Sequence, residues 1–365
     1  MVRRAVLKRP SSRLETGRHR RATASTMDAP FGLTPLEAAA VLPSTAAAYH
    51  VAVRRFAEWC GLTGKSWSTV EILDLVLVEF LNHLYFDGAN VGEATQTIAG
   101  LKHFLPSTGA KTVERGLPRV QRALRGWGKL APAAQRLPVP RSLAMAIAGV
   151  LAVQGHTRMA SFVALSFVCY LRPTEGILLR GDSVVTPTAL MGHAYRCHGL
   201  ILHDATKGLV GKTGVSDESV LLDLDEWLAP ILVALSQRAG RHGSLWDFTL
   251  EQLRDKFSDA AAVVDPKLPS PHLYSLRHGG ASDDWLSGRR TLMEIKIRGR
   301  WSCDGSLRRY SKATRLQREM SKLTNEIAQF GNNVERHFAA LLVAGGNGGR
   351  LPFVIPARFL PALRQ

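Results

Sequence analysis

The chain has 365 residues, of which 45% are hydrophobic and 21% are charged, so most of it can fold around a core. At about 150 residues per domain this length suggests two domains. A net charge of +17 and a pI near 10.3 indicate an anionic macromolecular partner. Residues 1–26 carry +7 of that charge, so the folded part needs a basic surface as well.

The cysteines and the apolar runs exclude several classes of protein. The four cysteines are far apart, with no CxxC pair and no His/Cys ligand spacing, which favours reduced thiols and an intracellular location. The most apolar run, ILDLVLVEFLNHLYF, is too short and too charged to span a bilayer and predicts a buried helix. The arginine-rich start has no apolar stretch after it, so we expect no secretory signal.

Residues 1–35 form a basic leader that is short of acidic residues, and we predict that it is disordered. It could be a nuclear or organellar targeting segment, a DNA-binding arm, or a leader of no specific role. From 36 to 130 the chain predicts a helical domain. Apolar periodicity and capping residues place helices over about 44–60, 68–86 and 93–105.

A fourth helix is predicted in VERGLPRVQRALRGWGKL, and its charge is one-sided. No acidic residue follows Glu114, whereas a solvated helix face usually mixes both signs. This pattern favours contact with a phosphate backbone over an ordinary basic surface. The residues on or beside the basic face are Arg115, Arg119, Arg122, Arg125 and Lys129.

Prolines in APAAQRLPVPRS predict a semi-rigid linker over 131–141, and a second domain follows over 142–345. Two β-like runs, HAYRCHGLILHDA and ESVLLDLD, interrupt its helical patterns and predict a hairpin. The fold class is therefore mainly α with a small antiparallel sheet (α+β). An amphipathic pattern from Leu316 to Leu341, with a break expected at 331–333, either packs on its own domain or docks on a neighbouring protomer. Residues 346–365, which begin inside GGNGGR, are predicted to be a flexible tail.

Four separated segments carry residues suited to a phosphate. YLRPTEG offers Arg172 with Glu175 three residues on, and SPHLYSLRHGG offers Arg277 near a helix start. The hairpin connection carries Lys207 and Lys212, and RGRWSCDGSLRRYSK carries Trp301 and Tyr310. Taken alone, each has a simpler explanation, such as a structural ion pair for Arg172 or a solvated lysine in the hairpin.

Together, the order of these segments and the nine-residue spacing from Trp301 to Tyr310 resemble the tyrosine recombinase (phage integrase) family across roughly residues 40–345. The resemblance implies a helical core-binding (SAM-like) domain followed by a catalytic domain. It implies that Arg172 and Arg277 clamp the scissile phosphate, a role suited to planar guanidinium donors. It also implies that Tyr310 is the nucleophile that forms a 3′-phosphotyrosine.

The resemblance implies supporting roles as well. Trp301 would donate its indole N–H to a phosphate oxygen, Glu175 would brace Arg172, and Lys212, with Lys207 in reserve, would be the general acid. Three arginines of RGRWSCDGSLRRYSK are also expected to contact the DNA backbone; these are Arg300, Arg308 and Arg309.

One position departs from the family pattern. The family's HxxR motif is Tyr274-Ser275-Leu276-Arg277 here, and a phenol with a reference pKa of about 10 is a poor general base. His272 is a possible substitute, or a simple loop or DNA-contact residue, and His278 is expected to pack or cap.

The expected function is a site-specific recombinase or integrase, of the kind carried by mobile elements, that acts on double-stranded DNA as a dimer or tetramer. It would need no metal and no ATP, and it would not act at a membrane. We expect it to be located with DNA, which means the nucleus if the source is eukaryotic. The alternatives are a type IB topoisomerase-like relaxase and a DNA-binding descendant without activity.

Overall fold

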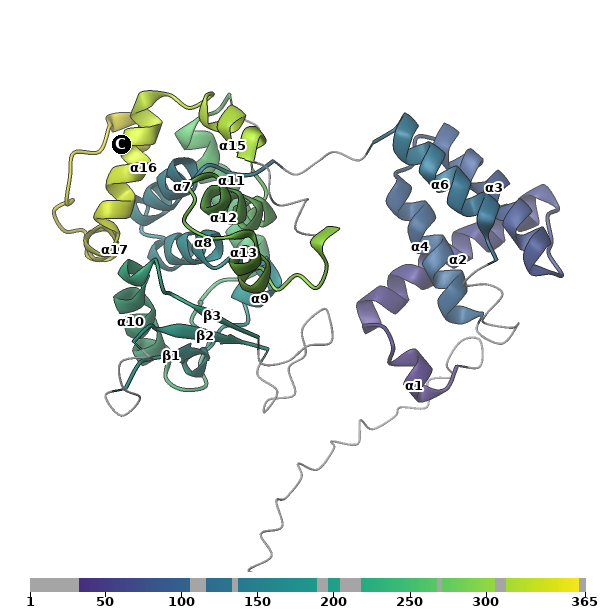
Figure 1. Cartoon of the computed structure of the whole chain (residues 1–365), viewed down its shortest axis with the longest axis horizontal. Coiled ribbons are helices and arrows are strands. Elements are labelled where there is room, and N and C mark those ends of the chain that lie inside the picture. Colours follow the sequence, from purple (N-terminus) through teal and green to yellow (C-terminus); the bar gives the residue numbers. More distant parts are fainter. Residues whose placement is uncertain are drawn as a thin grey trace, which may run out of the picture. The chain divides into compact units, whose positions relative to one another are not determined.

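A computed structural model describes residues 33–105, 116–132, 137–188, 196–203, 218–267, 271–305 and 313–360. The chain divides into two compact units, Met1–Ala134 and Gln135–Gln365, each described below by itself (Figure 1). The division falls inside the linker predicted at 131–141. Most of the predicted leader lies outside the described residues.

The N-terminal unit is helical. Its helices are α1 (Pro35–Ala38), α2 (Pro43–Thr63), α3 (Val70–Phe86), α4 (Val91–Phe104) and α6 (Pro118–Leu130). Thr69 and Asn90 cap α3 and α4 through their side chains, and Gly64 ends α2 with φ +65, a value that glycine adopts without strain. Thus α2 runs three residues beyond the end predicted at about 60.

The core of this unit is aromatic, and a buried acid ties its last helix in place. The ring of Phe56 lies 5.1 Å from that of Phe80 and 5.3 Å from that of Trp67, measured between centroids. Asp74, which is 3% exposed, accepts hydrogen bonds from the backbone N–H groups of Arg119 and Val120, each at 3.0 Å. Because these amides open α6, the carboxylate of α3 serves as its N-terminal cap.

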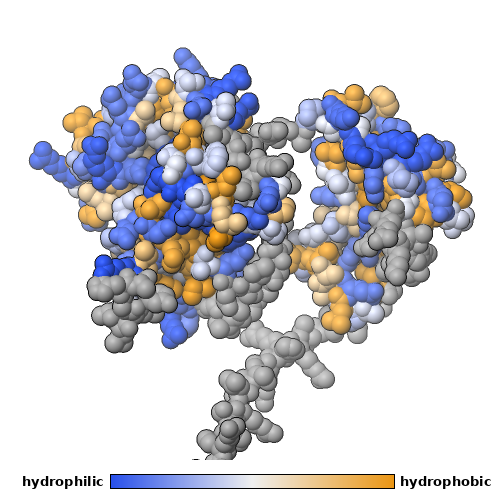
Figure 2. Space-filling view, in the orientation of Figure 1, coloured by the Kyte–Doolittle hydropathy of each residue, from blue (hydrophilic) through white to orange (hydrophobic). Residues whose placement is uncertain are grey.

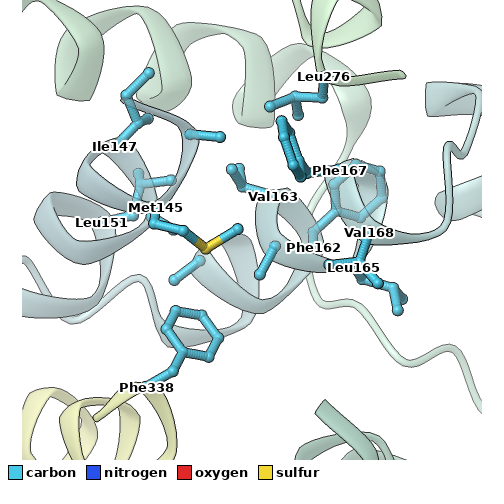
Figure 3. Close-up of a cluster of buried hydrophobic side chains, with 14 of the residues drawn as sticks. Met145, Ile147, Leu151, Phe162, Val163, Leu165, Phe167, Val168, Leu276 and Phe338 are labelled. Atoms are coloured by element: carbon cyan, nitrogen blue, oxygen red, sulfur yellow. The ribbon is translucent and has the colours of Figure 1, made fainter. Parts of the chain in front are cut away.

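The C-terminal unit is built on two largely buried helices, α7 (Arg141–Val153) and α8 (Thr157–Val168). Around them lie α10 (Ala229–Ala239), α11 (Leu250–Val264), α12 (Leu273–Leu286), α16 (Asn325–Arg336) and α17 (Phe338–Asn347). Figure 3 shows how residues of α7 and α8 meet Leu276 of α12 and Phe338 of α17. The shorter helices are α9 (Pro173–Gly176), α13 (Leu292–Arg298) and α15 (Ala313–Met320), with 3-10 turns at 181–183, 226–228 and 357–359.

A small antiparallel sheet lies at one end of this unit, beside α10 (Figure 1). Its strands are β1 (Val184–Val185), β2 (Gly199–Leu202) and β3 (Glu218–Leu221), in the order β1-β2-β3. Leu200 pairs with Val184 on one side and Val220 on the other. The sequence predicted β2 and β3; the two-residue β1 is too short to give a periodic signal.

The C-terminal pattern differs from its prediction in where it is interrupted. It divides at 321–324 and at His337, not at 331–333, because Gly331 lies inside α16, where a Cβ would come within 1.9 Å of the Ser142 carbonyl oxygen on α7. Its apolar residues pack on their own unit.

Part of the predicted flexible tail, residues 355–359, packs on the C-terminal unit. Phe359 is fully buried and stacks on Phe330 with ring centroids 4.3 Å apart, while Arg358 lies 2.7 Å from Glu326. The apolar residues after GGNGGR follow no regular period, so the sequence pattern does not predict their packing. The fold class stands as predicted, mainly α with a small antiparallel sheet. None of the described helices has the length and apolar character needed to cross a membrane.

Candidate active site

The site begins where α8 ends and α9 starts. Arg172 is the N-cap residue of α9, and Pro173 occupies the first helical position, where its missing N–H costs nothing. The carboxylate of Glu175 accepts from the backbone N–H of Arg172 at 2.8 Å and from its guanidinium Nη1. Trp246 holds α9 from behind by donating its indole N–H to the Gly176 carbonyl at 2.6 Å. The three-residue spacing of Arg172 and Glu175 therefore folds into a fixed ion pair.

Arg277 reaches the same carboxylate from α12. Its side chain is fully buried, and its Nη1 lies 4.0 Å from Glu175 Oε2. The guanidinium donates to the carbonyl oxygens of Tyr170 and Gly299, and it lies over the Trp301 ring, 5.0 Å from the centroid. These contacts fix the plane of the guanidinium, as a planar donor for an oxyanion requires.

Two glycines allow α12 to come close enough. A Cβ on Gly279 would lie 2.2 Å from the Val139 carbonyl oxygen, and one on Gly280 would lie 2.0 Å from that of Phe167. Both neighbours are backbone atoms that cannot turn aside. The HGG sequence after Arg277 thus sets the depth at which this arginine sits.

Arg300 corrects the sequence prediction. It was grouped with residues that contact the DNA backbone, yet its side chain is only 3% exposed and lies inside the site. Its Nη2 donates to Glu175 Oε2 at 2.6 Å and to the Tyr170 carbonyl at 3.1 Å, and its Nε lies 3.5 Å from Glu218. A φ of +55 at Arg300 turns the side chain inward, which no local pattern reveals. We refer to Arg172, Arg277 and Arg300 around Glu175 as the arginine site.

The arginine site holds more positive than negative charge. Burial, together with the like charges of Arg300 and Arg172, lowers the pKa of Arg277 to about 10. Burial opposes the ionisation of Glu175, but the guanidinium of Arg300 and the contacts from Arg172 hold its pKa below the ordinary value. The charged form of Arg277 is thus disfavoured by about 3 kcal/mol, at 1.36 kcal/mol per pKa unit. An incoming anion would relieve this repulsion.

Strained backbone converges on this site. Among the described residues, the non-glycine residues with positive φ are Tyr170 at 47, His203 at 54 and Arg300 at 55. The carbonyl of Tyr170 accepts from Arg277 and Arg300, while His203 Nε2 lies 3.9 Å from Glu175 Oε1. Such conformations cost about 1–3 kcal/mol each and cluster at functional sites.

One set of described residues has the spacing of metal ligands. Glu175, His203 and Glu218 bring one ligand atom each within 4.8 Å of one another. Both carboxylates face guanidinium groups, and a cation between them would meet the positive charges of Arg172 and Arg300. The charge balance therefore suits an anion better than a metal ion.

The other residues predicted for the site lie around Arg277. Trp301 is 7% exposed beneath the Arg277 guanidinium. Tyr274 is half-buried, and its ring lies 5.4 Å from that of the buried His278. His272 is exposed as the N-cap residue of α12 and makes no side-chain cap. Tyr274, His278 and Trp301 thus share the neighbourhood of Arg277, whereas His272 stands at its edge.

Several predicted residues lie outside the described part of the chain. They are the hairpin lysines Lys207 and Lys212, the proposed nucleophile Tyr310, and the arginines Arg115, Arg308 and Arg309. Their assignments remain predictions from the sequence.

The basic helix is α6 of the N-terminal unit. Arg119, Arg122, Arg125 and Lys129 are exposed, while Val120 and Trp127 are buried against α3 and α4. Figure 2 shows hydrophilic residues gathered over α6. No salt bridge to these four side chains occurs within the described residues, so their charge faces solvent.

The sequence missed His203, Glu218 and the backbone role of Tyr170. His203 directly follows β2 and Glu218 begins β3, so both enter the site through strand pairing. Neither stands in a motif, and only the long-range register of the sheet brings them to α9.

No protein-family model matches this chain, and no curated protein matches its sequence. Solved structures similar to it include a post-cleavage complex of the XerH site-specific recombinase bound to palindromic difH substrate. That match has 13% identity and a TM-score of 0.39, and it covers 69% of this chain and 78% of that chain. XerA recombinase matches at 15% identity and a TM-score of 0.36, over 74% of this chain and 97% of that chain.

A pre-cleavage XerH complex with difH matches at 12% identity and a TM-score of 0.36, over 69% of this chain and 78% of that chain. At these scores the matches carry no functional argument, and the functional conclusion rests on the geometry of this chain.

Proposed function

We propose that this protein is a DNA strand-breaking and rejoining enzyme, a site-specific recombinase or integrase that forms a 3′-phosphotyrosine intermediate. In this proposal Arg172 and Arg277 hold the scissile phosphate and Tyr310 attacks it. The P–O bond to the tyrosine forms as the bond to the 5′-oxygen breaks, and Lys212 or Lys207 protonates the departing oxygen. The covalent bond conserves the energy of the broken one, so rejoining needs no ATP.

The observation that carries the proposal is the arginine site. The buried guanidinium groups of Arg277 and Arg300 and the half-buried one of Arg172 surround one carboxylate, and the pKa of Arg277 is lowered to about 10 by burial and by its like-charged neighbours. Fixed, unneutralised donors of this kind stabilise a phosphorane transition state without reorganising during the reaction. Trp301 closes the site beneath Arg277.

The charge on α6 supports DNA as the source of the phosphate. Four exposed cations follow one another on a single helix that is anchored by Asp74. A small anionic substrate would need no second basic surface on a separate unit. Lys/Arg contacts with DNA phosphates provide affinity that does not depend on sequence.

The test is covalent trapping on nicked duplexes of random sequence. A nick placed near the attacked phosphate makes the piece that carries the free 5′-hydroxyl short enough to diffuse away. Rejoining is then impossible, and the protein stays linked to DNA. We expect wild type to form an adduct and Tyr310→Phe to form none, and sequencing the linked DNA would identify the target. If wild type forms no adduct across the library, the proposed strand-breaking activity is refuted. If Tyr310→Phe forms an adduct, the assignment of Tyr310 as the nucleophile is refuted.

A second candidate is favoured by a specific observation, the tyrosine at position 274. Without a proton carrier there, the chain could be a DNA-binding descendant that no longer cuts. DNA binding in gel-shift assays together with no adduct would support it. A third candidate, a type IB topoisomerase-like relaxase, would relax supercoils as a monomer and join no two sites.

A further inference from the structure

Arg300 occupies a backbone position at which glycine is the usual residue. At the end of α13 the Arg300 N–H donates to the Ile297 carbonyl at 2.9 Å, and the Trp301 N–H donates to the Lys296 carbonyl at 3.1 Å. This pair of hydrogen bonds is the Schellman motif, in which the residue after the helix cap takes a left-handed conformation that favours glycine. Arg300 has φ +55 and therefore carries strain that a glycine would not. The strain points to a function for the side chain.

The guanidinium of Arg300 is directed at acceptors of the protein. Its Nη2 donates to Glu175 Oε2 at 2.6 Å and to the Tyr170 carbonyl at 3.1 Å, and its Nη1 donates to the Arg298 carbonyl at 2.8 Å. Its Nε lies 3.5 Å from a carboxylate oxygen of Glu218. All three nitrogens thus face protein oxygens, and the side chain is 3% exposed. This geometry suits a residue that holds other groups in place better than one that binds a substrate directly.

The two acceptors of the Arg300 Nη2 are the groups that hold the other arginines of the site. The carboxylate of Glu175 accepts from the backbone N–H and the guanidinium of Arg172, and the Tyr170 carbonyl accepts from the guanidinium of Arg277. Glu175 Oε2 lies 2.6 Å from Arg300 but 4.0 Å from Arg277, so Arg300 contributes more of the charge that balances this oxygen. Without Arg300, the ion pair between Glu175 and Arg277 would strengthen and compete with an anion for the Arg277 guanidinium.

We propose that Arg300 is a positioning residue for phosphate: it balances the charge of Glu175 and holds the Tyr170 carbonyl, and so keeps Arg172 and Arg277 directed at the anion. This inference rests on the proposed function, in which the anion is the scissile phosphate of DNA. The effect of Arg300 on phosphate passes through Glu175, which distinguishes it from a direct contact with the DNA backbone. It also differs from a purely structural tie at the end of α13, which would change stability but not the affinity of the folded protein for phosphate.

The first experiment measures phosphate affinity in variants that suit the backbone. Glycine and asparagine both accept the left-handed conformation, so Arg300→Gly and Arg300→Asn remove the guanidinium while the end of α13 stays intact. Inorganic phosphate is titrated into full-length protein labelled with ¹⁵N-tryptophan, and the Trp301 indole signal reports binding beside Arg277. We expect each variant to bind phosphate on the order of tenfold more weakly than wild type.

Arg289→Gln is the matched control for these variants. The Nη2 of Arg289 also bridges a backbone carbonyl and a buried carboxylate, since it donates to the Leu224 carbonyl at 3.0 Å and to Asp225 at 3.1 Å. Its partners are not those of the arginine site, so Arg289→Gln should keep the wild-type Kd for phosphate. A wild-type Kd in either Arg300 variant, or an equal loss of affinity in Arg289→Gln, would overturn the inference while the anion site stands.

A double-mutant cycle separates the role of Arg300 from its charge alone. Arg300→Gly is compared in the wild-type background and in the Glu175→Gln background, where no carboxylate remains at this position to be balanced. We expect the loss of phosphate affinity caused by Arg300→Gly to shrink below about threefold in the Glu175→Gln background. An equal loss in both backgrounds would show that Arg300 acts as an independent charge, and it would overturn the inference.

The second experiment uses the trapped DNA sequence. At saturating DNA we expect Arg300→Gly to form the covalent adduct on the order of a hundredfold more slowly than wild type, because misplaced binding groups cost about that much. Its affinity for random-sequence duplex, and the salt slope of that affinity, should match wild type. A lower salt slope would show that Arg300 contacts the DNA backbone directly, and it would overturn the inference.

The outcomes for the two proposals differ. If wild type forms no adduct but the phosphate results are as expected, the proposed function is refuted and the role of Arg300 in phosphate binding stands. If wild type forms the adduct and Arg300→Gly forms it equally fast at saturating DNA, the inference is refuted and the proposed function stands. If phosphate does not move the Trp301 signal of wild type, the anion site and the inference are refuted together.

Discussion

Glu175 is the carboxylate that the guanidinium groups of Arg172, Arg277 and Arg300 share, so its neutralisation is the sharpest test of the arginine site. In Glu175→Gln the amide keeps the shape but no longer balances Arg172, Arg277 and Arg300. The side chain is 2% exposed and accepts from Arg300 at 2.6 Å, so solvent screens little of the loss. Removing one partner of a buried ion pair costs about 3–5 kcal/mol, and we expect a loss in that range.

The loss should be partly reversible by an added anion. Inorganic phosphate that occupies the arginine site binds only the folded state, and ligand at a hundredfold its Kd stabilises by about 2.7 kcal/mol. Because the variant has more uncompensated positive charge, phosphate should stabilise it by about 1–2 kcal/mol more than wild type.

Amide hydrogen exchange of α8 and α12 measures this stability within the C-terminal unit. The matched control is Glu335→Gln, which removes a carboxylate from Arg141 at 2.8 Å, outside the arginine site. This variant should be less stable than wild type, but phosphate should stabilise it no more than it stabilises wild type. A loss below about 1 kcal/mol in Glu175→Gln, or equal phosphate responses in the two variants, would refute the reasoning.

Four further predictions concern the scaffold and the DNA surface. Gly280→Ala should cost about 1–3 kcal/mol in chemical denaturation, since its Cβ meets the Phe167 carbonyl at 2.0 Å, whereas Gly126→Ala on α6, with no atom within 4 Å, should stabilise slightly. Phe359→Ala should cost about 3–5 kcal/mol by the same assay, and a loss like that of the part-exposed Leu360→Ala would contradict its burial. Arg122→Gln should weaken binding to random-sequence duplex and lower the salt slope by about one, while the exposed Arg238→Gln of the C-terminal unit should not. Glu175, Asp223 and Asp225 have folded pKa values below their ordinary values of 4.5, 3.8 and 3.8, so these carboxyl groups bind fewer protons in the folded state than in the unfolded state. The stability that they contribute is therefore complete above their ordinary pKa values. It should fall as the pH drops below those values, as acid denaturation would measure.

The sequence predicted those parts of the fold whose signal is local. Capping residues and apolar periodicity located α2, α3 and α4, and the apolar runs located β2 and β3. The buried C-terminal segment escaped prediction because its order comes from contacts with α16 that lie far away in sequence. Likewise, α16 continues through Gly331 because it packs closely on α7, which a periodic pattern cannot reveal.

The candidate site divides in the same way. Arg172 and Glu175 were predictable because an N-cap position and the third helical residue always meet. Arg300 was assigned to the wrong surface, since a sequence pattern does not show the left-handed backbone that turns its side chain inward. His203 was missed because β2 and β3 must pair before it approaches Glu175.

The cost of this site explains why it is built where it is. Three residues in left-handed conformation and several like-charged guanidinium groups close together would be too unfavourable for an isolated loop. Here Tyr170 follows α8, a largely buried helix, and its hydroxyl donates to Asp284 of α12, which also pairs with Arg290 at 3.0 Å. The carbonyl of the same Tyr170 then orients Arg277 and Arg300. Since the core and the guanidiniums share this one residue, relaxation of the strain would require the α8–α12 packing to move, and the site stays poised for an anion.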